Sequence, residues 1–543
     1  MYLPLFGILL LATCHVACVE EYTEELHLSS LPNDDFSTVF RFVTTGDVLE
    51  NPNEYLYIPL TIRQFFDYPI DEFHLSMTTG TWRHSQWGLQ PQEESPTGIS
   101  LKAKFKDIGK TEIDKTWSRL VQQVNGVFCS SILEVDPVFT TVPDGARIST
   151  NDSLLRYGHL AGEPLCTENI KPFLRLLPCK EKGFASVIRL TEVFGTSFHT
   201  LSVRAVKTPT SWRVELFAHF VKSRVRLLSR HEHVAFRVPL TTALQCGVAA
   251  RQSIVYNLKS AYTASFKNGT TESSDSSFEL SSLDLSKYDS FIVQIEQKRT
   301  QSLVASSEAT PFIVTFSREK SDARSGIMST GITNNLPDVQ YADFMHTIPW
   351  QLHVEMDSLQ FTCVDAVTAA ISPGVILNKT LIPSLIKERP MSVFFRLQLP
   401  GRSICTLKLA FTTHLMTALS YPPDSNYGIF VSGPIITVNL TEATFRKYSG
   451  VLGSFANTEI KSRGELTEAS KATPRAVVLH GEPMLVFLPV PDFSMPFNVI
   501  AIVTIVTGFL FGSTFNLTVK IFLPDLETPS TGEKKTGLRR FFS

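Results

Sequence analysis

Residues 497–519 read FNVIAIVTIVTGFLFGSTFNLTV, and no charged side chain interrupts them. At 1.5 Å per residue, a helix over this stretch is roughly 34 Å long, which is enough to cross the hydrocarbon core of a bilayer with some tilt. We therefore predict a transmembrane helix at residues 495–519, so that most of the chain lies on one side of a membrane.

The charges on either side of this helix predict its orientation. No Lys or Arg occurs between Arg475 and Lys520 on the N-terminal side. Basic residues follow on the other side: Lys520, Lys534, Lys535, Arg539 and Arg540. Because cytosolic flanks carry the excess of Lys and Arg, residues 520–543 are predicted to be a cytosolic tail. The polar tail also argues against a signal for attachment of a GPI anchor, since such a signal ends in its apolar stretch.

Residues 1–18 have the features of a secretory signal peptide. An uncharged apolar run leads to the small residues Val16-Ala17-Cys18, and the run is shorter than the roughly 20 residues that a spanning helix needs. We expect this segment to be removed. The mature chain would then be a single-pass type I protein, with its bulk in the lumen and its C-terminus in the cytosol.

The body between these two segments is predicted to be mainly β. Short runs in which apolar and polar residues alternate are separated by Gly, Pro, Asn and Asp, which is typical of antiparallel sheets. Such runs occur at residues 39–43, 291–295, 394–399 and 477–488. Because 543 residues exceed what one hydrophobic core supports, we expect two luminal antiparallel β-sandwich-like domains, residues 19–250 and 251–494, with a few helices.

One helix and one hairpin are predicted in more detail within the first domain. Apolar residues recur at helical spacing behind Thr111 and Asp114, which resemble a weak capping box. The stripe consists of Ile113, Trp117, Leu120, Val121, Val124 and Phe128. Residues 71–88 alternate into the turn Thr79-Gly80 and out through two tryptophans, which predicts a hairpin on which Arg83 stacks against an indole ring.

The sequence contains no recognisable catalytic motif. The nucleophile elbow, the P-loop, the zinc-binding helix and the dinucleotide-binding glycine motif are all absent from it. His231-Glu232-His233 places two imidazoles on one strand face without a third ligand, so a solvated strand or loop is the simpler interpretation. A net charge of -2 provides no basic field for nucleic acid. We therefore predict no catalytic residue, metal, cofactor or nucleic-acid partner.

The cysteines indicate structural disulfides in an oxidising compartment. Outside the predicted signal peptide they are Cys129, Cys166, Cys179, Cys246, Cys363 and Cys405. No C-x-x-C spacing occurs, which argues against zinc knuckles and thioredoxin-like chemistry. Cys363 and Cys405 lie in strand-like runs and are candidates for a cross-strand bond. From the residues alone, Cys166 is expected to bridge to Cys179 or Cys129.

Two further patterns concern the surface and the membrane helix. N-x-S/T acceptors predict N-glycosylation in luminal surface loops at Asn151, Asn268, Asn378 and Asn439. Within the membrane stretch, small and polar residues recur every four positions at Thr504, Gly508, Gly512 and Asn516. Such a stripe lets another helix approach closely, so it is either a helix-packing face or a chance arrangement on a lone helix.

Several segments, in order along the chain, resemble motifs of one family. They read DKTW at 114–117, CTEN at 166–169, YPPDSNYG at 421–428 and PVPDFSMPFNVI at 489–500. Together with residues 71–88 they resemble the PIG-T family, whose members are subunits of the GPI transamidase. The resemblance covers nearly the whole mature chain.

This resemblance implies a non-catalytic scaffold subunit of a transamidase complex in the endoplasmic reticulum membrane. The complex joins the new C-terminus of a proprotein to a GPI lipid, and the nucleophile belongs to a separate, caspase-like subunit. Cys166 aligns with the family cysteine that forms an interchain disulfide to that subunit, and the membrane helix would pack with the other membrane subunits. The competing interpretations are a type I cell-surface adhesion or receptor glycoprotein and, less favoured, a luminal hydrolase.

The same resemblance places a lipid head group near the luminal end of the membrane helix. Asp492, Ser494 and Asn498 lie at that interface, with Asn426 from the Pro-rich loop as a further residue. We predict that these polar side chains contact the glycolipid. The alternative is that Asp492 or Ser494 caps the helix ahead of Pro496, which stabilises a helix by about 1 kcal/mol.

Overall fold

The computed structural model divides the chain into two compact units, Met1–Pro489 and Val490–Ser543. The structure describes residues 20–31, 35–47, 57–90, 95–128, 131–135, 137–143, 154–163, 165–222, 233–239, 249–257, 262–267, 277–279, 290–297, 310–320, 322, 324–417, 428–441, 444, 475–489 and 494–520. The predicted signal peptide and nearly all of the predicted cytosolic tail therefore lie outside the described residues.

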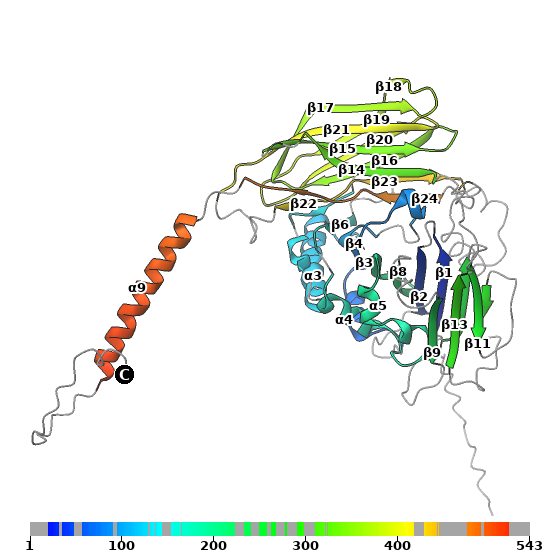
Figure 1. Ribbon diagram of the computed structural model, residues 1–543, viewed down its shortest axis with the longest axis horizontal. Coiled ribbons are helices and arrows are strands. Elements are labelled where there is room, and N and C mark those ends of the chain that lie inside the picture. The colour runs from blue at the N-terminus through cyan, green and yellow to red at the C-terminus, as the bar shows by residue number, and fades with distance from the viewer. Residues whose placement is uncertain are drawn as a thin grey trace, which may run out of the picture. The chain divides into compact units, whose positions relative to one another are not determined.

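A ten-stranded sheet forms the first part of the larger unit (Figure 1). Its strands are β1 (Glu21–Ser30), β2 (Phe36–Asp47), β3 (Ile70–Thr79), β4 (Gly98–Phe105), β5 (Thr140–Thr141), β6 (Leu155–Leu160), β7 (Phe198–Lys207), β8 (Ser211–Lys222), β10 (Arg251–Asn257) and β12 (Ser277–Glu279). The order is β12-β10-β1-β2-β8-β7-β3-β4-β6-β5. Neighbours are antiparallel except β1 and β10, which run parallel.

The two faces of this sheet differ because side chains alternate along each strand. On β3, Phe73, Leu75 and Met77 point into an apolar core, whereas Ser76 and Thr78 lie on the opposite, polar face. Helices cover the apolar face and contribute residues to its core: α1 (Leu60–Arg63), α3 (Lys110–Phe128), α4 (Thr167–Leu176) and α5 (Leu190–Phe194). Shorter 3-10 turns are η3 (Gln64–Asp67), η4 (Ser131–Val135) and η6 (Phe184–Val187).

Helix α3 confirms the predicted stripe. Its buried face contains every residue that the spacing predicts, and Thr116 in addition. The predicted capping box is wrong, because the helix already begins at Lys110, so that Thr111 lies inside its first turn. Asp114 instead accepts hydrogen bonds from the buried guanidinium of Arg156, at 2.9 Å from Nε and 2.8 Å from Nη2.

The predicted hairpin at residues 71–88 is also wrong in its second half. Strand β3 pairs with β4 and β7, and a helical turn, α2 (His84–Trp87), follows it in place of a return strand. The turn lets Trp82 and Trp87 enter one buried cluster, with their ring centroids 5.0 Å apart. The predicted stacking of Arg83 is confirmed, since its guanidinium carbon lies 5.4 Å from the centre of the Trp87 ring.

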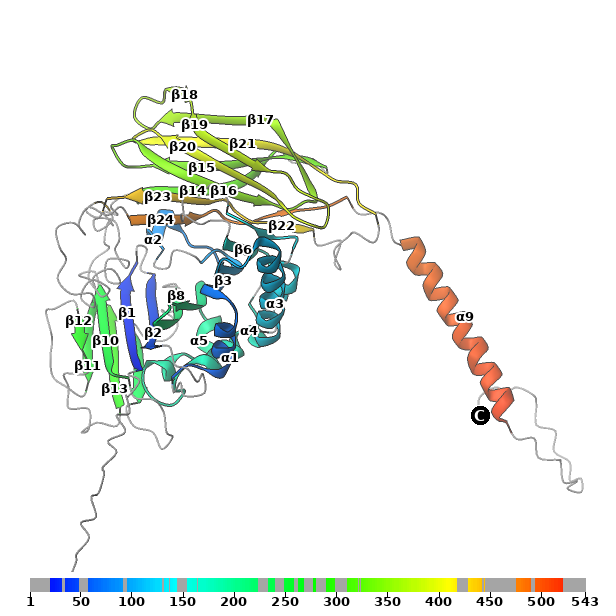
Figure 2. The ribbon, with the colours of Figure 1, turned by 180° about the vertical axis from the view of Figure 1, so that it is seen from behind.

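A β-sandwich forms the second part of the larger unit (Figures 1 and 2). One sheet has the order β14-β15-β21-β17-β18, with β14 (Phe312–Glu319), β15 (Ser325–Asn334), β21 (Ser403–Thr413), β17 (Leu352–Asp365) and β18 (Ile371–Pro373). The other has the order β19-β20-β16-β23-β24, with β19 (Val375–Ile382), β20 (Met391–Leu399), β16 (Gln340–Ile348), β23 (Ile435–Leu440) and β24 (Arg475–His480). The sandwich confirms the expected antiparallel architecture.

Two small sheets complete the described β structure. Strands β11 (Tyr262–Lys267), β13 (Ser290–Gln297) and β9 (His233–Pro239) form one antiparallel sheet, and β22 (Ile429–Val431) pairs with β25 (Met484–Val486) in the other. The larger of the two main clusters of described core residues ends at Ile254. The other runs from Phe312 to Leu488 and also includes Leu89. A domain boundary near residue 250 stays a prediction.

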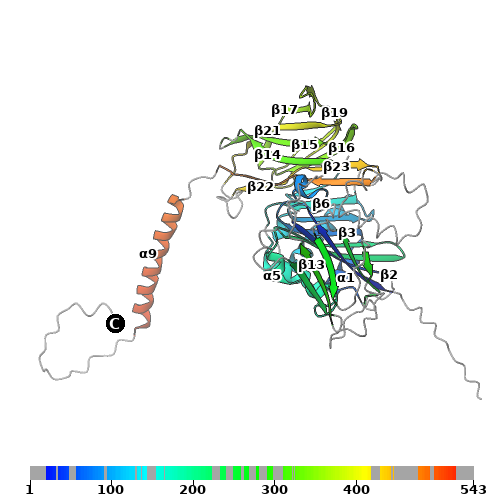
Figure 3. The ribbon, with the colours of Figure 1, turned by 45° about the vertical axis from the view of Figure 1, so that its right-hand side comes forward.

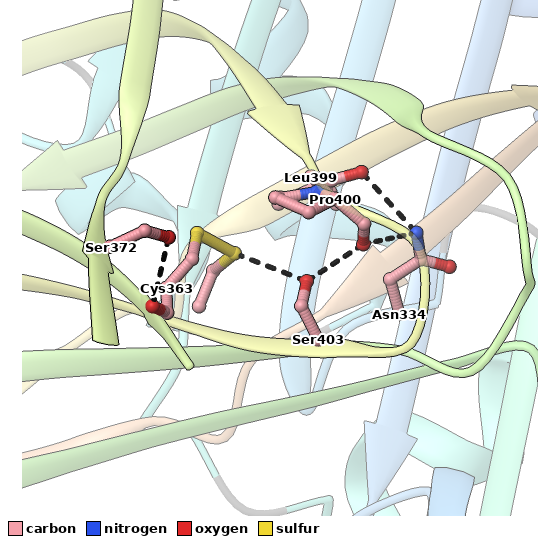
Figure 4. Close-up of a disulfide and its surroundings, with 7 residues drawn as sticks. Asn334, Cys363, Ser372, Leu399, Pro400 and Ser403 are labelled. Carbon is pink, nitrogen blue, oxygen red and sulfur yellow. Dashed lines mark hydrogen bonds between the residues drawn. A yellow bond between two sulfur atoms is a disulfide. The ribbon is translucent and has the colours of Figure 1, made fainter. Parts of the chain in front are cut away.

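A disulfide joins two neighbouring strands within one sheet of the sandwich (Figure 4). Cys363 on β17 lies directly opposite Cys405 on β21, and the two are bonded, as the sequence predicts. Next to the bond, Ser403 Oγ donates to the carbonyl oxygen of Pro400 at 2.7 Å, and Asn334 Nδ2 donates to the same oxygen at 2.9 Å. Because the bond joins residues 42 positions apart, it stabilises the fold by about 4 kcal/mol in the chain-entropy description.

The smaller unit contains helix α9 (Ser494–Val519), which Figure 3 shows as one continuous helix. Among the described residues, Phe497–Val519 is the helical stretch long and apolar enough to span a membrane. The predicted C-terminal apolar helix is confirmed, and its crossing of a membrane stays a prediction.

Candidate functional site

The candidate site is centred on Cys166, the residue that caps the N-terminus of α4. Its thiol is free and exposed, whereas Cys179 is disulfide-bonded and Cys363 and Cys405 are bonded to each other. The expected intrachain bridge from Cys166 to Cys179 or Cys129 is therefore wrong for this structure. Cys129 and Cys246 themselves lie outside the described residues.

The side chain of Asn169 holds Cys166 in place through hydrogen bonds. Its side chain is 1% exposed, and its Oδ1 accepts hydrogen bonds from both the backbone N–H and the Sγ–H of Cys166, each at 3.0 Å. Its Nδ2 donates to the carbonyl oxygen of Phe128 at 3.0 Å. Phe128 is the last residue of α3, where carbonyl groups lack helical partners. One buried amide thus joins the end of α3 to the start of α4.

The role of Asn169 was missed at the sequence level, although a signal for it exists. A polar residue three positions after a helix cap is the spacing of a capping box, in which the side chain reaches back to the cap N–H. Here the cap residue is Cys, which is outside the usual Ser, Thr, Asp and Asn, so the pattern does not predict a helix start.

The surface next to the thiol is polar. Helix α4 buries Ile170, Phe173 and Leu176 against the core of the first sheet. Its opposite side exposes residues of both charges and one hydroxyl, namely Thr167, Glu168, Lys171 and Arg175. The thiol therefore lies at the edge of a solvated, mixed-charge stripe, accessible to another protein.

The predicted helix-packing residues lie along the exposed length of α9. Built Cβ atoms on Gly508 and Gly512 would meet no other atom within 4 Å, so both glycines leave room for a neighbour. Thr504 Oγ1 donates to the carbonyl oxygen of Ile500 at 2.8 Å, which satisfies its hydrogen within the helix. Asn516 lies one turn from the end of α9. Helix packing through this stripe stays a prediction.

The predicted glycolipid contacts fall only partly within the described residues. Asn498 is exposed in the first turns of α9, and Ser494 is its first residue. Asp492 and Asn426 lie outside the described residues, so the structure does not bring the four side chains together.

The predicted glycosylation sites divide in the same way. Asn378 on β19 and Asn439 on β23 are exposed, and both lie on strands, whereas surface loops were expected. Asn151 and Asn268 lie outside the described residues.

The buried charges of the first sheet form a structural network. Arg41 on β2 lies between two neighbouring strands, with Nε 2.6 Å from Glu215 Oε1 on β8 and Nη1 3.3 Å from Glu25 Oε2 on β1. Burial favours the neutral form of Glu215, but the Arg41 guanidinium holds the pKa of that carboxyl below its ordinary value. Among the described residues, no group of three or more His, Cys, Asp or Glu side chains is arranged to hold a metal ion. His231 and Glu232 lie outside those residues.

Comparisons with known proteins agree over almost the whole chain. The model of the family described as "Gpi16 subunit, GPI transamidase component" matches residues 6–224 and 206–541. The GPI-anchor transamidase component PIGT of Mus musculus is 29% identical, over 94% of this chain and 91% of the mouse protein. The GPI transamidase component GPI16 of Saccharomyces cerevisiae is 23% identical, over 92% of this chain and 88% of the yeast protein.

Proposed function

This chain belongs to the Gpi16 family of GPI transamidase components, and from that premise we propose that it is the non-catalytic scaffold subunit of the complex. In this role it holds a caspase-like catalytic subunit through a disulfide at Cys166 and helps to position the GPI lipid beside the membrane. The observation that carries the proposal is the free, exposed thiol at a helix start that a buried side chain holds in place.

A disulfide at Cys166 would keep two subunits together without a large interface. Once the bond forms, each further contact between the subunits is intramolecular, so its effective concentration rises. Forming the bond takes two protons and two electrons from the two thiols, and an oxidised protein disulfide accepts them by thiol–disulfide exchange. The Sγ–H bond to Asn169 is then lost, but the backbone N–H of Cys166 keeps its own bond to that oxygen.

Membrane anchoring supplies the second half of the role. We propose that α9 crosses the endoplasmic reticulum membrane with the N-terminal body in the lumen and residues 520–543 in the cytosol. The stripe Thr504, Gly508, Gly512 and Asn516 packs against other membrane subunits. At the luminal end, Asp492, Ser494, Asn498 and Asn426 contact the GPI head group, whose hydroxyl and amine groups suit polar partners.

The disulfide is tested on nonreducing gels of the complex purified from cells that express the full-length chain. Cys166→Ser should remove a higher-mass band that reducing agent also removes. Thr167→Ala, on the adjacent exposed residue, is the matched control and should retain the band. A band that persists in Cys166→Ser would show that the link uses a different residue or does not exist.

The lipid contacts are tested by attachment of a GPI anchor to a reporter protein. Asn498→Ala should lower surface display of the reporter while the complex still co-purifies intact, and Val499→Ala is the control on the neighbouring exposed position. Loss of assembly in Asn498→Ala would instead assign this residue a structural role.

A further inference from the structure

Gly162, in the turn after β6, packs closely against Phe430 of β22, a strand of a different sheet. Gly162 follows β6 and lies in the segment that leads to Cys166. A Cβ built on Gly162 would lie 2.0 Å from Cδ2, 2.6 Å from Cγ and 2.8 Å from Cε2 of Phe430. Ordinary contacts begin at 3.4 Å, so the flat side of the ring lies directly on the glycine.

Strand β22 holds Phe430 in this position. Side chains alternate along the strand, so Ile429 and Val431 are buried in the core of the sandwich while Phe430 points the other way. Opposite them, β25 contributes Met484 and Val486 to the same core. After β25 the chain continues to the membrane helix, whose first residue is Ser494.

Phe430 thus packs against Gly162, four residues before Cys166, and Asn169 ties the cysteine itself to the end of α3. We propose that Gly162 and Phe430 are positioning residues, which set the Cys166 thiol relative to the strand pair from which the chain enters the membrane. This inference rests on the proposed function, in which Cys166 is bonded to the catalytic subunit. The contact of Gly162 with Phe430 would then fix how far that subunit lies from β22 and β25.

The contact predicts a specific pattern of substitution. Gly162→Ala adds one methyl group where the ring already lies, so either the segment before Cys166 or β22 has to move. Phe430→Ala removes the ring and leaves room for that methyl group. The two substitutions should therefore be harmful singly, most of all at Gly162, and should compensate each other in combination.

The experiment uses the full-length chain in cells that lack their own copy, with the Cys166-linked fraction measured on nonreducing gels and normalised to total protein. Gly162→Ala should lower the linked fraction at least about threefold, and Gly162→Ala with Phe430→Ala should return it to within about twofold of the parent chain. The control is Gly126→Ala in α3, where an added Cβ meets nothing within 4 Å.

Each outcome decides the proposal. An unchanged linked fraction in Gly162→Ala would overturn it, and so would a double variant that does not recover. If Gly162→Ala fails to accumulate, recovery of both accumulation and linkage in the double variant still supports the contact, and failure of the double variant still overturns it. Cys166→Ser tests the proposed function separately, because a band that survives in that variant rejects the disulfide whatever happens at Gly162.

Discussion

The start of α4 and helix α9 are the two regions that we propose to contact other subunits, but the chain supports them in different ways. The buried amide of Asn169 holds Cys166, and the ring of Phe430 packs against Gly162, four residues earlier. Along α9, the described side chains from Phe497 onward are exposed, and Gly508 and Gly512 have no atom near a built Cβ. The fold therefore pre-positions the thiol, whereas no described atom of the chain lies close to a Cβ built on either α9 glycine.

The largest expected difference is in how acid changes the stability of the larger unit, Met1–Pro489, which contains Cys166, and of helix α9. Burial, with a further contribution from His480, lowers the pKa of His84 to about 4, and burial also lowers that of His159, on β6, to about 4. An unfolded His titrates near 6.5, so between about pH 6.5 and 4 the unfolded state binds more protons than the folded state. The free energy of unfolding of the body should fall over that window by about 3 kcal/mol for each histidine.

Helix α9 contains no ionisable side chain, so its helicity should not change over the same pH window. Tryptophan fluorescence reports the body alone, because all 5 tryptophans precede residue 351. Denaturation of the full-length protein in detergent at pH 7 and pH 5, followed by fluorescence, measures the difference. Equal stability at the two pH values would show that these histidines are not held in their neutral form.

Removing the amide that supports Cys166 should have the next largest effect. Asn169→Ala leaves the buried carbonyl of Phe128 and the N–H of Cys166 without their partner, so the free energy of unfolding should fall by about 2–3 kcal/mol. Thr167→Ala, one position after the cysteine, should change it by less than about 0.5 kcal/mol. Chemical denaturation of both variants measures this difference. Equal stabilities would contradict the proposal that Asn169 holds Cys166 in place.

A bulky residue in the α9 stripe should give a smaller and purely intermolecular effect. Gly512→Leu meets no atom of its own chain, so the stability of the body should stay the same. Association with other membrane helices should weaken by about 1–2 kcal/mol, seen as reduced co-purification of the membrane subunits. Val506→Leu, on exposed apolar surface of the same helix, is the control. Unchanged co-purification in Gly512→Leu would mean that the stripe is not an interface.

The smallest effect is expected at Thr504. Its hydroxyl hydrogen already bonds to the Ile500 carbonyl, so Thr504→Val should weaken helix association by less than about 0.6 kcal/mol. The same co-purification assay measures it. A loss as large as that of Gly512→Leu would indicate that Thr504 bonds across the interface.

Local patterns explain which parts of the fold could be predicted from the sequence. The stripe of α3, the Cys363–Cys405 bond and α9 follow from spacing within one or two elements, and all three are confirmed. The prediction of a return strand in the hairpin is wrong. Burial of Trp82 and Trp87 in a common cluster favours a helical turn over a second strand with alternating side chains.

The candidate site depends instead on contacts between distant segments. The free state of Cys166 was not predictable from cysteine spacing, since pairing is decided in three dimensions. The contact of Gly162 with Phe430 joins the turn after β6 to β22, and no pattern near either residue in the sequence predicts it. The hydrogen bond from Asn169 to Phe128 likewise requires α3 and α4 to be packed first.

The most direct test of the account is disulfide mapping by mass spectrometry on the intact complex, digested without reduction. We predict a peptide containing Cys166 joined to a cysteine peptide from the catalytic subunit. A Cys166 that is recovered as a free thiol throughout, or joined to another cysteine of its own chain, would contradict the claim that this subunit holds its partner covalently.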